Sequence, residues 1–326
     1  MSIMCRFRRR LSVAVGLAPG IALLAGCSDT PGHHTIGIVN HVAGMDVVLQ
    51  GFKAQMAELG YSEGRHVTYV YHGVLDSEPA TIEREVVALR TLKVDLLLAL
   101  GTSPAIAAQK SLAGTAIPIV FAPVVNPVEE GLVERITRPG GNITGVQNGD
   151  ALPKSLEWLH KTIPKVKRVH VVYHPNDRVA LMALKSLHAA AGTIGVEIEP
   201  LPAHSRAMAL TLVEHLPRGA ALFLVPSPSL YPLEALIETA AKNGIAVAAS
   251  SPSHLRSATL LYYGADFDAM GRQAAGLVAQ IFKGAKPADL PVAKAEQMLR
   301  INLVTARRIG VDIQDQLLDQ ASLVIR

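Results

Sequence analysis

The clearest candidate for a chemical role in the sequence is a set of four residues between an apolar run and a helical pattern. Gly101 permits a tight turn, Ser103 is a favourable helix N-cap, and Pro104 suits the first helical position because that position needs no N–H donor. The free N–H groups of the first turn, together with the hydroxyls of Thr102 and Ser103, could bind a carboxylate or a phosphate. The alternative is a well-capped helix without a ligand. The Lys of a P-loop is absent, which argues against a nucleotide.

A second group of polar side chains stands where other predicted strands end, which is the edge at which parallel sheets bind their ligands. Asn126, before Pro127, can both donate and accept hydrogen bonds, although Asn is also a common turn residue before Pro. The same place after other strands is taken by Asn40, His41, Asn176, Ser227, Ser229 and Ser250. Each of these could contact a ligand, and each could instead be a loop residue or a cap of the next helix.

We predict that the protein is not an enzyme and holds no metal or cofactor. The sequence has no Gly-x-Ser-x-Gly elbow, no His-Glu-x-x-His, and no Gly-x-Gly-x-x-Gly after the first predicted strand. Its 12 His are scattered without the spacing of metal ligands.

The excess positive charge of the chain is concentrated at its start. A pI of about 9.1 would suit a nucleic-acid-binding protein. However, Arg6, Arg8, Arg9 and Arg10 stand in the segment 1–26, which contains no acidic residue. Without these four, Lys plus Arg falls from 31 to 27, equal to the 27 Asp plus Glu. Phosphate contacts need clustered Lys and Arg, so we expect no nucleic-acid partner.

Residues 1–26 are predicted to be a signal peptide. The arginine-rich start precedes an apolar run over 11–25, which is shorter than the roughly 20 residues that span a bilayer. The run ends in Leu24-Ala25-Gly26-Cys27, which is similar to a bacterial lipobox, where the Cys is lipidated and becomes the first mature residue. The alternative is an ordinary signal peptide with a chance Cys. We predict a lipoprotein of the bacterial cell envelope, anchored at the extracytoplasmic face through Cys27, with residues 27–34 as a tether.

The rest of the chain alternates short β-rich runs with helical patterns. Hydrophobic residues make up 49% of the full sequence, enough to bury a large core. The first half is predicted to contain strands over 35–39, 67–71, 94–100, 117–121 and 143–146, and helices over 47–59, 79–92 and 104–112. The second half is predicted to contain strands over 168–173, 196–200, 221–225, 246–249 and 259–263, and helices over 154–162, 178–191, 207–216, 233–243 and 266–282. This alternation predicts an α/β fold of two doubly wound, Rossmann-like parallel-sheet lobes with a ligand cleft between them.

Several segments, in this order, resemble a known family. They are Gly51-Phe52, residues 59–67, 94–102, 117–121, 131–133 and 138–146, Tyr263-Gly264, and residues 271–275 and 283–291. Together they are similar to the ABC-transporter substrate-binding lipoproteins related to the tryptophan/tyrosine-type binding proteins. The resemblance covers nearly the whole chain after the signal peptide.

The resemblance implies a type I periplasmic-binding-protein fold, in which the chain crosses between the lobes several times. The first lobe would comprise residues 35–146 with a return segment near 264–290, and the second would comprise 147–263 with a tail near 291–326. A small solute, often an amino acid, would close the lobes by a hinge motion. The closed form, expected to be a monomer, would then be presented to an ABC permease in the membrane.

The match to the family's binding motifs is uneven. Thr102-Ser103 fits the family's carboxylate anchor, but the family usually has Asp-Pro where this chain has Asn126-Pro127. An Asp could pair with a ligand ammonium, whereas Asn only hydrogen-bonds. The segment 226–229 also lacks an acid that is often found there. The sequence therefore suggests a solute with a carboxylate or another hydrogen-bonding anion, without a strong requirement for an ammonium group.

Three other functions stay open from the sequence. The same bilobed fold could serve a ligand-sensing subunit of a membrane signalling partner. It could also hold an enzyme active site in the cleft between the lobes. A third possibility is a protein-interaction module that binds no small ligand.

Overall fold

The computed structural model describes residues 32–251 and 258–326. The chain divides into two units, residues 1–32 and 33–326, and the fold described is that of the second. The predicted signal peptide and the lipidated Cys27 lie outside the described residues. Within the described part, every helix is too short or too polar to cross a bilayer.

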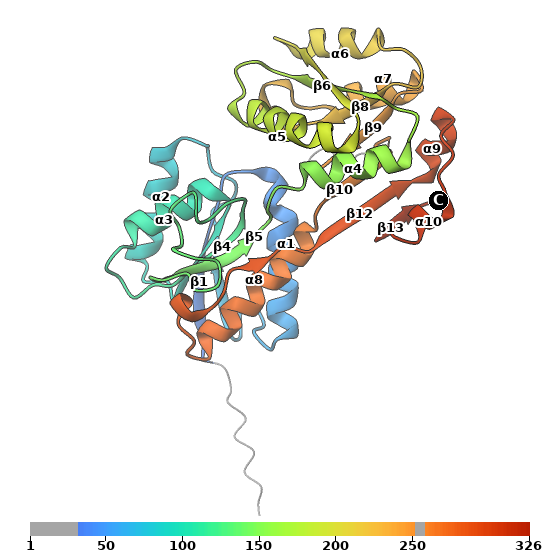
Figure 1. Ribbon diagram of the computed structural model, residues 1–326. Helices are drawn as coiled ribbons and strands as arrows, with labels where there is room; N and C mark the ends of the chain where they lie inside the picture. The colour runs from blue at the N-terminus through green and yellow to red at the C-terminus, as the bar shows by residue number, and fades with distance from the viewer. Residues whose placement is uncertain (1–31, 252–257) are drawn as a thin grey trace, which may run out of the picture. The chain divides into compact units, whose positions relative to one another are not determined.

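The first sheet is entirely parallel and has the order β11-β5-β4-β3-β1-β2. Its strands β1, β4 and β5 are labelled in Figure 1. Its strands are β1 (His34–Asn40), β2 (Val67–Val70), β3 (Leu96–Leu100), β4 (Ile119–Val124), β5 (Ile143–Gln147) and β11 (Ala293–Lys294). β3 is buried along its whole length, as expected for a central parallel strand with helices on both faces.

The helices that cover this sheet come from distant parts of the chain. They are α1 (Asp46–Glu58), preceded by a short 3-10 turn η1 (Ala43–Met45), then α2 (Pro79–Thr91), α3 (Thr102–Ser111) and α8 (Phe267–Phe282). Alternate side chains of β3 enter different cores. Leu96 and Leu98 pack with α1 and α8, whereas Leu97 packs with α2 and α3.

The second sheet has the order β13-β12-β10-β9-β8-β6-β7. Its strands are β6 (Arg168–Tyr173), β7 (Glu197–Pro202), β8 (Ala221–Leu224), β9 (Ala246–Ala249), β10 (Leu261–Ala265), β12 (Gln297–Asn302) and β13 (Leu323–Ile325). Its helical elements are α4 (Leu152–Thr162), α5 (Arg178–Ile194), α6 (Arg206–Glu214), η2 (Pro228–Leu230), α7 (Glu234–Lys242), α9 (Leu303–Ile309) and α10 (Asp315–Leu318), while a further turn, η4 (Pro287–Asp289), precedes β11.

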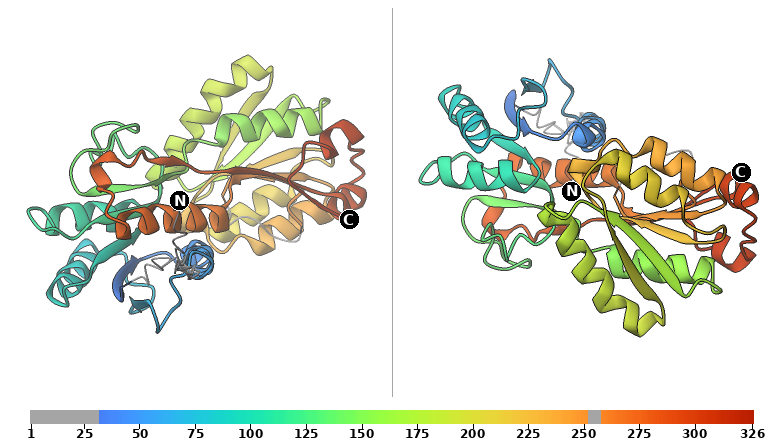
Figure 2. Two further views of the ribbon diagram at one scale, coloured as in Figure 1. Left: turned by 90° about the horizontal axis from the view of Figure 1, so that it is seen from below. Right: turned by 90° about the horizontal axis from the view of Figure 1, so that it is seen from above.

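Every strand and helix that the periodicity predicts is present, with ends shifted by a few residues. The prediction of parallel sheets is incomplete at one edge, because β12 pairs with β10 in the antiparallel direction and β13 runs alongside β12. These C-terminal strands, red in Figure 2, extend the second sheet. The cause is the path of the chain, which reaches β12 directly from β11 in the first sheet instead of through a crossover helix.

Three segments link the two sheets, and they are hydrogen-bonded to one another. The first joins β5 to α4, the second joins β10 to α8, and the third joins β11 to β12. The Asp266 N–H donates to the Glu296 carbonyl at 2.9 Å, and the Ala295 N–H donates to the Gln147 carbonyl at 2.7 Å. α8 and β11 thus belong with the first sheet, and β12 and β13 with the second. The lobe boundaries themselves stay a prediction.

The contact between α1 and α8 depends on two glycines. A Cβ on Gly271 would lie 2.0 Å from the Val48 carbonyl oxygen and 2.6 Å from the Phe52 nitrogen. A Cβ on Gly51 would lie 2.3 Å from the Asp268 carbonyl oxygen. The helices therefore approach each other at backbone distance, which only residues without a side chain allow.

Substituting Gly271→Ala is expected to destabilise the protein by roughly 2–3 kcal/mol, because the new methyl group collides with backbone atoms of α1 and forces the helices apart. Chemical denaturation followed by circular dichroism measures the change. The matched control is Gly276→Ala on the same helix, where a Cβ meets nothing within 4 Å. That control should leave stability unchanged or raise it by up to about 1 kcal/mol through helix propensity. Equal losses in both variants would contradict close packing as the role of Gly271.

Candidate functional site

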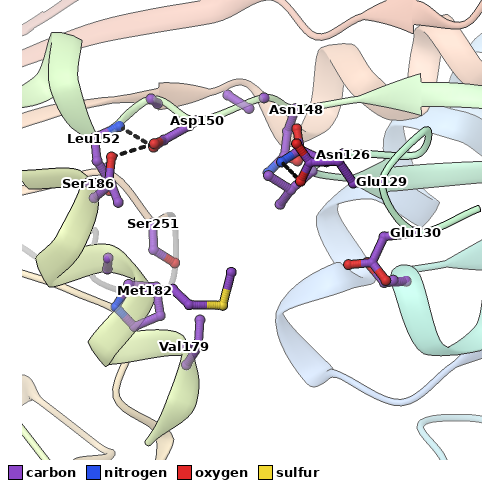
Figure 3. Close-up of a pocket in the computed structure, with 18 of the residues that line it drawn as sticks. Asn126, Glu129, Glu130, Asn148, Asp150, Leu152, Val179, Met182, Ser186 and Ser251 are labelled. Atoms are coloured by element: carbon purple, nitrogen blue, oxygen red, sulfur yellow. Dashed lines mark hydrogen bonds between the residues drawn. The ribbon is translucent and has the colours of Figure 1, made fainter. Parts of the chain in front are cut away.

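A cavity of about 380 Å³ opens where strands of both sheets end (Figure 3). From the first sheet it is lined by the start of α3 and by the segment after β4. From the second sheet it is lined by α5 and by the segments after β8 and β9. The links β5–α4 and β10–α8 complete the wall. The carboxyl ends of parallel strands commonly form such sites, because successive loops gather at one edge.

The start of α3 differs from the sequence prediction in one respect. The N-cap is Gly101, with φ of 105°, and no side chain caps the helix. The prediction of Ser103 as N-cap is wrong, because Gly101 takes up the non-helical backbone angle and α3 begins one residue later, at Thr102. Thr102 lines the cavity. Ser103 instead lines a separate cavity of about 280 Å³ between α2 and α3.

His41 and Asn40 support this corner without lining the cavity. Asn40 is fully buried, donates through Nδ2 to the Tyr71 hydroxyl at 3.2 Å and accepts from the Val42 N–H at 2.9 Å. The His41 ring lies against Gly101, so a Cβ there would be 3.3 Å from Cε1. Burial lowers the pKa of His41, which favours the neutral imidazole at this position.

The segment after β4 brings two carboxylates to the cavity. Asn126 Nδ2 donates to Glu129 Oε2 at 3.0 Å, so the amide holds the carboxylate in place. The Glu130 N–H donates to the Asn126 carbonyl at 3.0 Å, which closes the turn that contains Pro127. The Glu130 side chain lies across the cavity from Val179 and Met182 (Figure 3). The sequence predicted Asn126 but neither glutamate, since no motif marks them.

A third carboxylate, Asp150, is positioned by the link between β5 and α4. Its Oδ1 accepts from the Leu152 N–H at 2.9 Å, and its Oδ2 accepts from the Ser186 hydroxyl of α5 at 2.5 Å (Figure 3). These two bonds fix the carboxylate at the cavity wall. Sequence reasoning missed Asp150 as well, although an Asp shortly before a helix is a recognisable capping signal.

Two of the predicted serines bind another part of the chain. The Ser227 and Ser229 hydroxyls each donate to the Asp177 carboxylate at 2.6 Å, and the Ser229 N–H donates to it at 3.2 Å. Burial by itself would raise the pKa of Asp177, but these hydrogen bonds outweigh it and hold the pKa below its ordinary value. The arrangement ties the loop before α5 to the loop after β8.

The structure brings together three of the predicted ligand residues, namely Thr102, Asn126 and Ser250, which all line the cavity. The other predicted residues, which lie outside its lining, are Asn40, His41, Ser103, Asn176, Ser227 and Ser229. Eight of the nine follow strand ends as predicted, and Asn40 is itself the last residue of β1. Strand position alone did not separate the two groups, because the direction of each side chain depends on the loop that carries it.

The cavity wall combines apolar surface with negative charge. Met182 and Val179 of α5 line it with 62% and 44% of their surface exposed, which is unusual for large apolar residues unless something covers them. Glu129, Glu130 and Asp150 are the acidic members of the wall, and none of the described lining residues is Lys, Arg or His. Among residues 32–251 and 258–326, no cluster of three or more His, Cys, Asp or Glu is placed to hold a metal ion.

Comparison with known proteins gives a family match over most of the chain. The model of the family described as ABC transporter substrate binding protein matches residues 35–325. The chain is also similar to a tyrosine-binding protein of Clostridioides difficile (strain R20291), with 25% identity over 315 residues that cover 90% of each chain.

Solved structures with similar folds include two binding proteins. One, from Streptococcus pneumoniae, is an ABC domain in complex with L-Trp, with a TM-score of 0.74 and 21% identity over 90% of this chain and 100% of that one. The other, from Clostridium difficile, is the ligand-free, open structure of a substrate binding protein with adhesive properties, with a TM-score of 0.74 and 21% identity over 90% and 99%.

These findings confirm the resemblance inferred from the motifs and the two-lobed α/β architecture of type I periplasmic binding proteins. The chain belongs to the ABC transporter substrate binding protein family.

Proposed function

We propose that this protein binds a small amino-acid-like solute in the 380 Å³ cavity and delivers it to an ABC importer. The observation that carries the proposal is the position of the cavity, which is lined by strand ends of both sheets in a chain of this family. Its volume suits a small organic molecule. A similar protein is named for tyrosine binding, and a similar structure holds L-Trp.

The start of α3 is the proposed site for the solute's carboxylate. The first N–H groups of a helix have no partner within the helix, and the helix dipole favours negative charge there. Thr102 stands at this position and adds a hydroxyl donor. A carboxylate at the start of α3 would therefore be stabilised without a basic side chain.

Glu129 is the proposed partner of the solute's ammonium group. The sequence suggested that ammonium recognition is weak, because Asn126 replaces the Asp that the family usually has. Asn126, however, donates to Glu129 and holds its carboxylate at the cavity. Asn126 and Glu129 together would then supply the partner for the ammonium group that the resemblance assigns to a single Asp in the family. This modifies the expectation drawn from the motif alone and favours a solute with an α-amino group.

Closure around the solute would use the three links between the sheets. They are hydrogen-bonded side by side, so a small change in their backbone angles would move one sheet and its helices against the other. Exposed Met182 and Val179 would be covered by the solute in the closed form. Substrate-binding proteins of ABC transporters are extracytoplasmic, and we propose that lipidated Cys27 anchors this one, as a monomer, to the membrane that holds its permease.

Substituting Glu129→Gln tests ammonium recognition. Loss of a charge-assisted hydrogen bond costs about 1.5–3 kcal/mol, so affinity for L-amino acids should fall roughly 10- to 100-fold. Calorimetry would compare each L-amino acid with its deaminated analogue in both proteins. The analogue, which has no ammonium group, should bind the variant and the parent protein alike. The control is Glu214→Gln on α6, outside the cavity lining. Equal binding of amino acids and analogues by the parent protein would refute the assignment.

The lipid anchor is tested by Cys27→Ser. The variant should leave the membrane fraction and partition into the aqueous phase of a detergent separation, because the acylated thiol is lost. Mass spectrometry of the parent protein should find acyl chains on Cys27. The matched control is Cys5→Ser, which alters the other cysteine of the chain and should leave the protein in the membrane fraction. A Cys27→Ser variant that stays with the membrane would disprove the anchor.

A further inference from the structure

We propose that the preferred solute carries two positively charged groups joined by an aliphatic chain, as in a basic amino acid or an alkyl diamine. The proposal rests on the proposed solute-binding function, because it concerns the same cavity. It goes beyond that function by assigning the charge and the shape of the solute. Three features support it: the net charge of the cavity wall, the unused hydrogen-bond acceptor capacity of its carboxylates, and the position of its apolar side chains.

Among the described residues that line the cavity, the negative groups have no positive counterpart. Glu129, Glu130 and Asp150 bring three formal negative charges, and the described lining residues bring no Lys, Arg or His. A neutral amino acid would compensate one carboxylate with its ammonium but would add a carboxylate of its own. Closing the cavity would then bury excess negative charge, which is costly unless it is paired. A solute with a second cationic group reduces this excess by one charge.

Several carboxylates elsewhere on the protein pair with cations of the chain itself. Glu58 pairs with Arg272 at 3.0 Å, Glu83 pairs with Lys110 at 3.2 Å, and Glu238 pairs with Arg308 at 3.2 Å. In residues 32–251 and 258–326, neither Glu130 nor Asp150 has such an ion pair. These two carboxylates of the cavity wall are therefore open to pairing with a cation of the solute.

The geometry separates these carboxylates into two groups. Glu129 and Glu130 lie on the wall formed after β4, and Asp150 lies toward α5, held by Ser186 (Figure 3). An ionised carboxylate accepts about four hydrogen bonds, and Asp150 receives only two from the described part of the chain. It can therefore still accept bonds from a cationic group. A solute that satisfies both groups must extend from one wall to the other.

The middle of such a solute would meet apolar surface. Met182 and Val179 of α5 line the cavity opposite Glu130 and are exposed (Figure 3). A chain of methylene groups between two cations would bury these side chains while both ends reach carboxylates. On the wall beside Asn126, the Asn148 Oδ1 is covered and has no donor among the described residues.

Calorimetry with matched pairs of solutes tests the charge assignment. L-Lysine would be compared with L-norleucine, and L-arginine with L-citrulline, since each pair differs mainly in the second cation. We expect the cationic member to bind at least about tenfold tighter, and we expect the difference to shrink in high salt because screening weakens charge pairing. Cadaverine, which has no carboxylate, shows whether the start of α3 contributes to binding.

Three variants connect any preference to named residues. Asp150→Asn and Glu130→Gln should each reduce the lysine-over-norleucine preference about tenfold, while norleucine binding changes little. Ser186→Ala removes a hydrogen bond to Asp150 but keeps its charge, so the preference should persist. Circular dichroism and thermal unfolding verify that each variant is folded. Glu214→Gln again serves as the control outside the cavity.

The outcomes distinguish this proposal from the one on which it rests. If norleucine, tyrosine or tryptophan binds as tightly as lysine or arginine, the dicationic assignment is overturned and the solute-binding function stands. If none of these solutes binds to the folded protein, both proposals fail. A cation preference that survives both Asp150→Asn and Glu130→Gln would overturn the assignment of these two carboxylates as its source.

Discussion

The close crossing of α1 and α8 is the contact on which the rest of the arrangement depends. It joins residues 46–58 to residues 267–282, and Gly51 and Gly271 allow it because any side chain there would meet backbone atoms. Arg272, one residue further, pairs with Asp268 on its own helix and with Glu58 of α1 across the same contact. With α8 placed on the first sheet, the chain must cross from β10 to α8 and again from β11 to β12, so three links lie together beside the cavity.

The polar residues near the strand ends divide into two sets with different roles. One set is satisfied within the protein: Ser227 and Ser229 hold Asp177, and Asn40 bonds to the Tyr71 hydroxyl. These bonds hold the loops in place and leave few donors or acceptors free to bind a solute. The other set faces the cavity, where Asn126 positions Glu129 and Ser186 positions Asp150. In the second set an uncharged partner orients a carboxylate without neutralising it, which keeps the charge available.

The sequence was most informative where periodicity is strong. The buried run that became β3 and the alternation of strands with helices predicted the α/β class, because a parallel sheet buries both faces and its helices bury one. The antiparallel pairing of β12 with β10 was not predictable from periodicity, since a strand has the same pattern in either direction. The N-cap of α3 was misplaced by two residues, because Gly101 and Ser103 are both acceptable caps and only the backbone decides between them.

By itself, the sequence determined the elements, the family and the edge of the sheets where the candidate site would be, because hydrophobic period and motif order are local properties. Only the tertiary structure decided which side chains line the cavity. Glu129, Glu130 and Asp150 meet there from segments about twenty residues apart, together with α5 from further along the chain. Their shared negative charge was not evident from a chain that is neutral beyond its first 26 residues, because a net charge of zero says nothing about where charges gather.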